Sequence, residues 1–196
     1  MSPNKENLLP KDGIAWKIKL LEKERSKELM KSLVDDVKWK QEKIFIFGRE
    51  VLQPRLSAWF GGEGKSYSYS GLNLEPKDWS PILFELKTLI EKVSERSFNS
   101  ALLNYYRDGK DSMGWHRDNE KELGQNPVVA SLSLGQKRRF IMRHYENKRL
   151  KVPMELGEGD LLVMEGESQH KWEHGVPKTA KELGPRLNIT LRNIKF

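Results

Sequence analysis

The sequence predicts a mainly β fold with flanking helices, in which an N-terminal α+β part packs on a C-terminal β barrel or jelly roll. After Phe98, short runs with strand character follow one another, separated by Gly, Pro and Asn. No helical pattern of about 10–15 residues alternates with these runs. Such a succession is typical of barrels and jelly rolls rather than of a parallel sheet. The clear helical patterns both lie before residue 97.

The N-terminal half begins with a polar segment. Residues 1–13 contain two prolines and predict a disordered or loosely packed arm, and residues 13–21 predict a short strand. A helix is expected from Ser26, which suits a capped start. The apolar residues of this helix recur at helical spacing: Leu29, Met30, Leu33, Val34 and Val37.

Strands and a second helix complete the N-terminal half. Strands are expected over residues 43–47 and from Pro54, and a Gly-rich loop over residues 61–70 leads into alternating Ser and Tyr. A helix is predicted over residues 80–96, where Ile82, Leu83, Leu86, Leu89, Ile90 and Val93 share one side.

The C-terminal half supplies the strands of the barrel. The strand-like runs are FNSALLNYYR, PVVASLSL, RRFIMRHY, LKVPMEL, DLLVMEG and RLNITLRNIKF. The expected organisation is an arm (1–13), an α+β part (14–97) and a β core (98–196). We expect these parts to form one integrated domain.

The composition restricts the kinds of site that the chain can build. It contains no cysteine, which excludes disulfides, thiolate metal ligands and a cysteine nucleophile. No apolar run approaches the ~20 residues that span a bilayer, so we expect an intracellular protein without a membrane partner. The formal net charge of +7 favours polyanionic partners such as nucleic acid.

One carboxylate follows a histidine at metal-ligand spacing. In an extended segment His116 and Asp118 would point to the same face and could hold one ion. His174 is the candidate third ligand, with His170 as the alternative, whereas His144 is expected to be a surface side chain. Two His and one carboxylate leave open the coordination positions that a non-haem iron(II) oxygenase needs. The alternative is a hydrogen-bonded His–Asp pair in a turn.

The last predicted strand alternates polar and apolar residues. Its polar face carries Arg186, Asn188, Thr190 and Arg192. This face either lies in water or surrounds a small anion inside the barrel, where arginine can bind a carboxylate through two hydrogen bonds. The order of HxD, a later His and RxNxTxR is much rarer than any one of these motifs.

With these motifs the sequence resembles the AlkB family of Fe(II)/2-oxoglutarate-dependent dioxygenases, most closely the animal-type nucleic-acid demethylases. The similar segments cover most of residues 39–196 and stand in the family's order: QPRLSAWFG, SYSYS, FNSALLNYYRDGKDSMGWHRDNE, ASLSLG, LLVMEGESQHKWEHGVPK and GPRLNITLRNIKF. The resemblance implies a double-stranded β-helix core and an N-terminal nucleotide-recognition lid.

The resemblance also assigns roles to single residues. It implies that iron(II) is bound by His116, Asp118 and His174. It implies that Arg186 pairs with the distal carboxylate of 2-oxoglutarate. The remaining residues near this cosubstrate would be Asn104, Tyr106, Thr190 and Arg192.

Four lid residues would contact the target base or its backbone, by the same resemblance: Trp39, Tyr67, Ser68 and Tyr69. Aromatic side chains can stack on an extruded base. The alternative is that they simply pack a sheet. Asn119 departs from the family pattern, because an acidic residue often follows the HxD aspartate near the target base. An amide donates as well as accepts hydrogen bonds, so this position bears on the choice of base.

The implied activity is oxidative removal of N-alkyl groups of the 1-methyladenine and 3-methylcytosine type from DNA, with O2 as second cosubstrate and formaldehyde as product. RNA or protein substrates, a catalytically dead nucleic-acid-binding fold and a zinc hydrolase are the alternatives. We expect a monomer, cytoplasmic in a bacterium or nuclear in a eukaryote.

Overall fold

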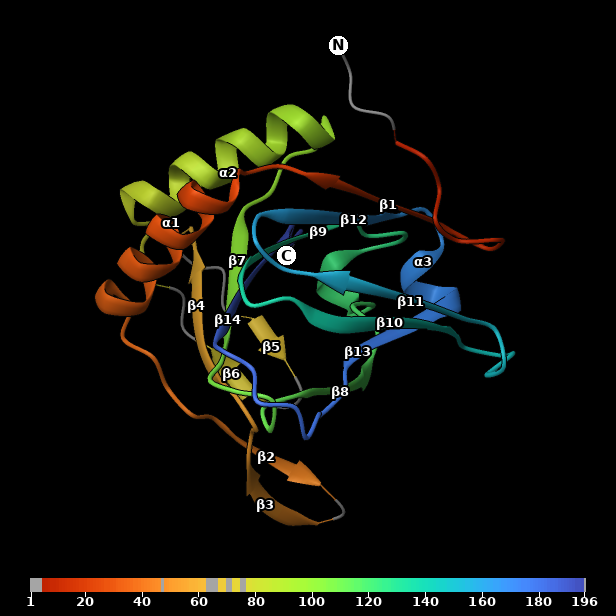
Figure 1. Ribbon diagram of the computed structural model, residues 1–196. Helices are drawn as coiled ribbons and strands as arrows, with labels where there is room; N and C mark the ends of the chain where they lie inside the picture. Colours follow the sequence, from red (N-terminus) through yellow and green to blue (C-terminus); the bar gives the residue numbers. More distant parts are fainter. Residues whose placement is uncertain (1–4, 47, 63–66, 70–71, 75–76, 196) are drawn as a thin grey trace.

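The computed structural model describes residues 5–46, 48–62, 67–69, 72–74 and 77–195. Two antiparallel sheets form a barrel, and two helices lie side by side outside the larger sheet (Figure 1). The predicted mainly β fold with flanking helices is therefore confirmed, and it is consistent with a jelly roll.

The larger sheet joins strands from both halves of the chain. Its six strands lie in the order β1 (Ile14–Lys19), β12 (Asp160–Glu165), β9 (Val129–Gly135), β14 (Arg186–Arg192), β7 (Ser100–Tyr106) and β4 (Leu56–Gly61). Because β1 and β4 belong to this sheet, the position near residue 97 lies within one continuous hydrogen-bonded unit.

The smaller sheet closes the other side of the barrel. Its strands lie in the order β11 (Lys151–Leu156), β10 (Arg138–His144), β13 (Trp172–Val176) and β8 (Met113–His116). Two hairpins stand apart from both sheets: β2 (Lys43–Ile46) with β3 (Arg49–Leu52), and β5 (Tyr67–Tyr69) with β6 (Leu72–Leu74). Figure 1 shows the β2–β3 hairpin projecting away from the barrel.

The alternation along β14 separates the core from the barrel interior. Leu187, Ile189 and Leu191 are buried in one cluster with residues of α1 (Lys23–Asp36) and α2 (Pro81–Ser94). The polar residues of β14 point the other way and line an internal cavity together with strands of the smaller sheet. Of the two readings of this polar face, the one that places it inside the barrel is correct.

The two helices begin differently. In α2, Ser80 is the N-cap, its hydroxyl accepts the Leu83 N–H, and Pro81 follows it as the first helical residue. The expected cap at Ser26 is wrong, because α1 starts at Lys23 and Ser26 lies inside the helix. Its N–H bonds to the Glu22 carbonyl and its side chain is fully buried, so packing outweighs the local preference of serine for a cap.

The segment before β1 also differs from expectation. Its described part, residues 5–13, is not a loose arm, because Leu9 is buried in the second core cluster and the Asn7 side chain accepts the N–H groups of Leu9 and Ala15. The Trp172 indole donates to the carbonyls of Lys11 and Asp12. We call residues 7–13 the N-terminal clip, since they fasten the chain to the barrel.

Several short elements were not expected from the sequence. They are β3, β6, β8, β13, a 3-10 helix (Lys121–Leu123) and the one-turn helix α3 (Ser168–Lys171). Each is at most five residues long, too short for a periodic pattern to be recognised. Among the described residues, no helix is long and apolar enough to cross a lipid bilayer.

Candidate active site

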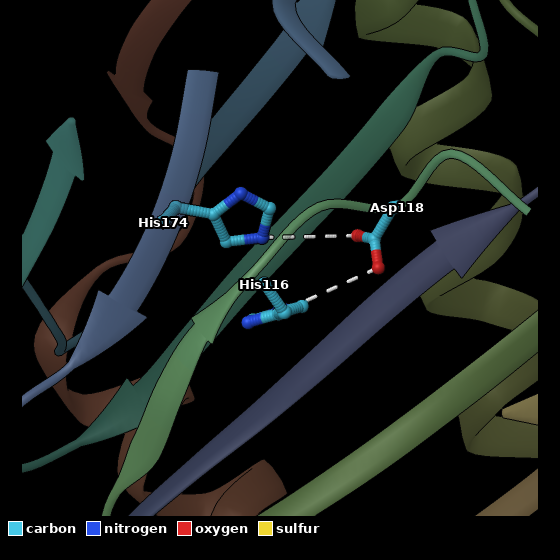
Figure 2. Close-up of side chains that lie close together, drawn as sticks. All are labelled: His116, Asp118 and His174. Atoms are coloured by element: carbon cyan, nitrogen blue, oxygen red, sulfur yellow. Dashed lines mark ion pairs between the residues drawn. The ribbon is translucent and has the colours of Figure 1, made fainter. Parts of the chain in front are cut away.

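Two strands of the smaller sheet bring the three predicted metal ligands together. His116 is the last residue of β8 and lies directly opposite His174 of β13, and Asp118 follows two residues later. Figure 2 shows both imidazoles directed at the Asp118 carboxylate. Their Nε2 atoms lie 4.0 Å (His116) and 3.8 Å (His174) from its two oxygens. One ligand atom from each residue lies within 4.8 Å of the others, so the three residues could hold one metal ion.

The electrostatics of the site keep these residues in the protonation states that bind metal. Burial alone would raise the pKa of Asp118, but the charge of Arg192, whose Nη2 donates to Oδ1 at 2.7 Å, and the nearby imidazoles lower this pKa to about 2. Burial, followed by the charge of His116, lowers the pKa of His174 to about 3. The site therefore presents a carboxylate anion and a neutral ring at neutral pH.

A buried carboxylate oxygen without a hydrogen-bond partner in the described structure indicates that a cation fits between these three residues. Asp118 is 0% exposed, yet its Oδ2 has no hydrogen-bond partner among the described residues. The Nδ1 of His174 is likewise buried without one. A buried polar atom without a hydrogen bond is costly, and for an anion the cost is larger. Bound metal would compensate Oδ2, and two neutral imidazoles with one carboxylate form the donor set of iron(II) oxygenases.

The two other histidines do not join this group. His144 was expected on the surface, but it is 1% exposed, and its Nε2 lies 3.1 Å from the Asp12 carboxylate of the N-terminal clip. His144 also packs edge-on against Trp172. His170 is half-buried and accepts the Asn126 N–H. His174 therefore completes the cluster, and His170 is excluded from it.

Arg186 lies in the cavity beside the triad. Its guanidinium is 1% exposed and lies 5.1 Å from the ring centre of Tyr106. One nitrogen, Nη2, donates to the Ser133 hydroxyl at 2.8 Å, whereas Nε and Nη1 are buried without a hydrogen-bond partner among the described residues. A buried cation with two open donors matches a carboxylate.

The other predicted cosubstrate residues line the same cavity, together with His116, Asp118 and His174. Thr190 donates to the Asn188 side chain, which itself donates to Ser131 and to the Leu132 carbonyl. Asn104 accepts a hydrogen bond from Arg55 at 2.8 Å. Arg192 is already paired with Asp118. Contact of these residues with a cosubstrate stays a prediction.

The predicted substrate residues are less closely gathered. Trp39 is half-buried, packs 5.4 Å from the Tyr105 ring, and donates its indole N–H to Val34; it is absent from the cavity lining. Asn119 is exposed beside Asp118. Tyr67, Ser68 and Tyr69 form β5, but their side chains lie outside the described part of the chain. None of these contacts is tested.

Sequence reasoning missed three residues around the site. Arg55 is 4% exposed and bonds to Asn104 and to the Ser112 carbonyl. Phe140 stacks on the His174 ring at 5.5 Å. Gln169 of α3 accepts the Asp118 N–H at 3.0 Å. Arg55 and Gln169 had a usable signal, since they stand in the family-like segments QPRLSAWFG and LLVMEGESQHKWEHGVPK, whereas Phe140 had none.

Comparison with known proteins agrees with this geometry. The sequence profile described as the 2OG-Fe(II) oxygenase superfamily matches residues 13–192. The chain is 42% identical over 177 residues to "Alpha-ketoglutarate-dependent dioxygenase alkB homolog 3" of Mus musculus, and the matched region covers 85% of this chain and 60% of that protein. It is 38% identical over 159 residues to "DNA oxidative demethylase ALKBH2" of Bos taurus, and the matched region covers 78% of this chain and 57% of that protein.

A solved structure shares this fold, and the curated relatives are longer than this chain. The solved structure of OsALKBH1 superposes with a TM-score of 0.63 at 18% identity, covering 94% of this chain and 99% of that one. The chain spans less than two thirds of the length of the two curated relatives described above.

Proposed function

The chain belongs to the 2OG-Fe(II) oxygenase superfamily, and we propose that it is an oxidative demethylase that removes N-alkyl groups from nucleobases in DNA. The observation that carries this proposal is the convergence of His116, Asp118 and His174 beside a buried arginine with unused donors. The relatives named above include a DNA oxidative demethylase, which supports the same choice of substrate.

The chain's own residues would supply binding and orientation. His116, Asp118 and His174 would hold iron(II), which with 2-oxoglutarate and O2 supplies hydroxylation of an N-methyl group, whose product breaks down to formaldehyde and the repaired base. Arg186 would bind the distal carboxylate of 2-oxoglutarate, with Tyr106 beside its guanidinium. Fixing the cosubstrate in one orientation before reaction removes an entropic cost from the reaction.

Arg192 would keep the metal-binding carboxylate ionised and oriented. Its 2.7 Å hydrogen bond uses Asp118 Oδ1 and leaves Oδ2 for the metal. A hydrogen-bonded partner behind a metal ligand fixes that ligand's direction. Asn188 and Thr190 bond to each other in the cavity, so they would shape its wall.

The substrate must present its methyl group to an enclosed site. A base inside a duplex cannot do so, and it must be single-stranded or flipped out. Methylation at the 1-position of adenine or the 3-position of cytosine weakens pairing, so such bases leave the stack at lower cost. The formal charge of +7 favours a polyanionic substrate. A DNA substrate implies action inside the cell, in the bacterial cytoplasm or the eukaryotic nucleus.

Release of formaldehyde tests the proposal. The full chain, with iron(II), ascorbate and 2-oxoglutarate, should release formaldehyde from DNA oligonucleotides containing 1-methyladenine or 3-methylcytosine, and an Asp118→Ala variant should not. The same lesions in RNA, and a methylated peptide, form the other arms. Turnover of the peptide alone would contradict a nucleic-acid substrate, and absence of 2-oxoglutarate turnover would favour a dead oxygenase fold.

Light scattering should give the mass of a monomer.

A further inference from the structure

The backbone that carries Asp118 leaves the β-sheet before it reaches this residue. β8 ends at His116, and residues 117–120 have no regular secondary structure. The cross-strand pair of His116 with His174 is therefore the last one on this side of the site. Strand pairing cannot hold Asp118, although the position of its carboxylate decides the geometry of the site.

The helix α3 takes over where the strand ends. The side-chain carbonyl oxygen of Gln169 accepts the Asp118 N–H at 3.0 Å. The carbonyl of His170 accepts from Arg117 at 3.0 Å, and the His170 ring accepts the Asn126 N–H at 3.3 Å. The single turn of α3 thus holds Arg117, which lies between His116 and Asp118, and it also holds Asp118 itself.

The buried Gln169 side chain makes its main hydrogen bond through its oxygen, which accepts the Asp118 N–H. It is 0% exposed, and the contact of its amide nitrogen within the described part of the chain is with the Met164 sulfur, at 3.5 Å. Sulfur is a weak acceptor, so the nitrogen gains little from this position. Burying an amide is costly unless it is hydrogen-bonded, and the bond that compensates this cost is the one to Asp118.

Close packing and hydrogen bonds support α3 from behind. The N-terminal clip lies against this helix, since an added Cβ at Gly13 would come within 2.9 Å of Ser168 backbone atoms. Trp172, the next residue after α3, donates its indole N–H to the clip. From there β13 continues to His174. The clip, α3 and β13 therefore tie Asp118 to the strand of the third ligand.

We propose that Gln169 is a positioning residue that fixes the backbone of Asp118, so that one carboxylate oxygen meets Arg192 and the other faces the two imidazoles. The inference rests on the proposed metal centre. Without the Gln169 acceptor, the Asp118 N–H must find water or a new partner, and a shift of the backbone would turn the carboxylate away from His174. Residues behind metal ligands typically contribute about 10–100-fold to metal affinity.

Cobalt(II) binding by the full chain, followed by visible absorption, tests this role without catalysis. Gln169→Met keeps the side-chain length and removes the acceptor, and it should weaken cobalt binding about 10–100-fold. Gln169→Glu keeps an oxygen in place and should bind cobalt more tightly than the Met variant. Asn99→Leu is the matched control, because the Asn99 amide makes two hydrogen bonds to Ile194 and does not line the cavity. It should lower the melting temperature and leave cobalt affinity unchanged.

The outcomes separate the two proposals. Cobalt affinity of Gln169→Met equal to that of the unmodified chain overturns the positioning role, and so does an equal loss of affinity in the Asn99→Leu control. If Gln169→Met does not fold, Gln169→Asn, which is one methylene too short, replaces it with the same expectation and the same overturning result. Failure of the unmodified chain to bind cobalt would instead overturn the metal centre itself.

Discussion

Arg138 and Arg186 are both buried in the barrel, and they differ in how much of their hydrogen-bonding capacity is used. Arg138 donates to the carbonyls of Asp108, Gly109, Asp111 and Pro177. Arg186 interacts with the side chains of Ser133 and Tyr106, and its Nε and Nη1 are buried with no hydrogen bond that meets the usual geometry in the described part of the chain. One guanidinium supports the fold, and the other is available for a ligand.

We therefore predict opposite effects of replacing these two arginines. Arg186→Met should raise the KM for 2-oxoglutarate about 10- to 150-fold, since a charge-assisted hydrogen bond contributes about 1.5–3 kcal/mol. Its melting temperature should not fall, because an uncompensated buried charge is removed. Arg138→Met should lower the melting temperature and leave that KM unchanged. Steady-state kinetics and thermal denaturation measure both, and an unchanged KM in Arg186→Met would withdraw its role.

The histidines of the site make the metal-free chain sensitive to acid. Burial, and then the charge of His116, lowers the pKa of His174 to about 3. The unfolded chain takes up this proton below about pH 6.5, and the folded chain does not. The free energy of unfolding should therefore be highest above pH 6.5 and fall toward pH 3, by about 1.4 kcal/mol per pH unit for one such group. The contribution of Asp118, whose pKa is about 2, is lost only below about pH 4.

Urea denaturation of chelator-treated protein at pH 7, 6 and 5 measures this slope. His174→Leu should show a shallower dependence than the unmodified chain, because it removes one of the groups that titrate. Parallel curves for the two proteins would mean that His174 is readily protonated in the folded state.

At the scale of elements, the length of a segment decided what the sequence could reveal. The two helices have 14 residues each, enough for an apolar period to repeat, and both were expected. The one-turn helix α3 and the strand β13 that follows it have nine residues together and a mixed composition. The pairing of His116 with His174 is non-local, so the residues alone left His170 open as an alternative, and the resemblance to a family favoured His174.

The N-terminal clip was misjudged for a similar reason. Its polar residues look solvated in sequence, but Lys11 and Asp12 contact residues more than a hundred positions away, as in the contact of Asp12 with His144. No local pattern predicts such contacts. Gly13 is the tightest point of the clip, with φ of +134° and the Ser168 backbone beside it.

We expect Gly13→Ala to destabilise the protein by more than about 1 kcal/mol, because a side chain there is strained by the positive φ and clashes with backbone atoms. The midpoint of urea denaturation measures this loss. Gly62→Ala is the control, since an added Cβ there meets nothing within 4 Å. Equal midpoints for the two variants would contradict the close packing of the clip on α3.

At the scale of the whole molecule, ligands should be part of the stability. Binding to the folded state alone adds about 2.7 kcal/mol at a hundred times Kd, which corresponds to about 5–10 °C in a domain of this size. Manganese(II) with 2-oxoglutarate should therefore raise the melting temperature by this amount. Asp118→Ala should abolish the shift, and an undiminished shift in that variant would place the bound metal elsewhere.

The fold class and the cluster of His116, Asp118 and His174 could be predicted, because strand-rich composition and a rare order of motifs can be recognised without three-dimensional information. The contacts of Trp39 could not, since whether an aromatic packs or faces a ligand depends on its neighbours in space. The proposed role of Gln169 could not be predicted either, because it depends on the end of β8 at His116, two residues before Asp118.

The pleat of β14 has a consequence for how this protein can change. Its odd-numbered residues from 187 to 191 join the helix-backed core, and its even-numbered residues from 186 to 192 face the cavity. Inserting or deleting a single residue within this strand would exchange the faces of the residues beyond the change, so that apolar side chains would enter the cavity and polar side chains would lie beneath the helices. A change of length should therefore be tolerated in the connection before β14 and should disrupt both the core and the cavity when it falls within the strand.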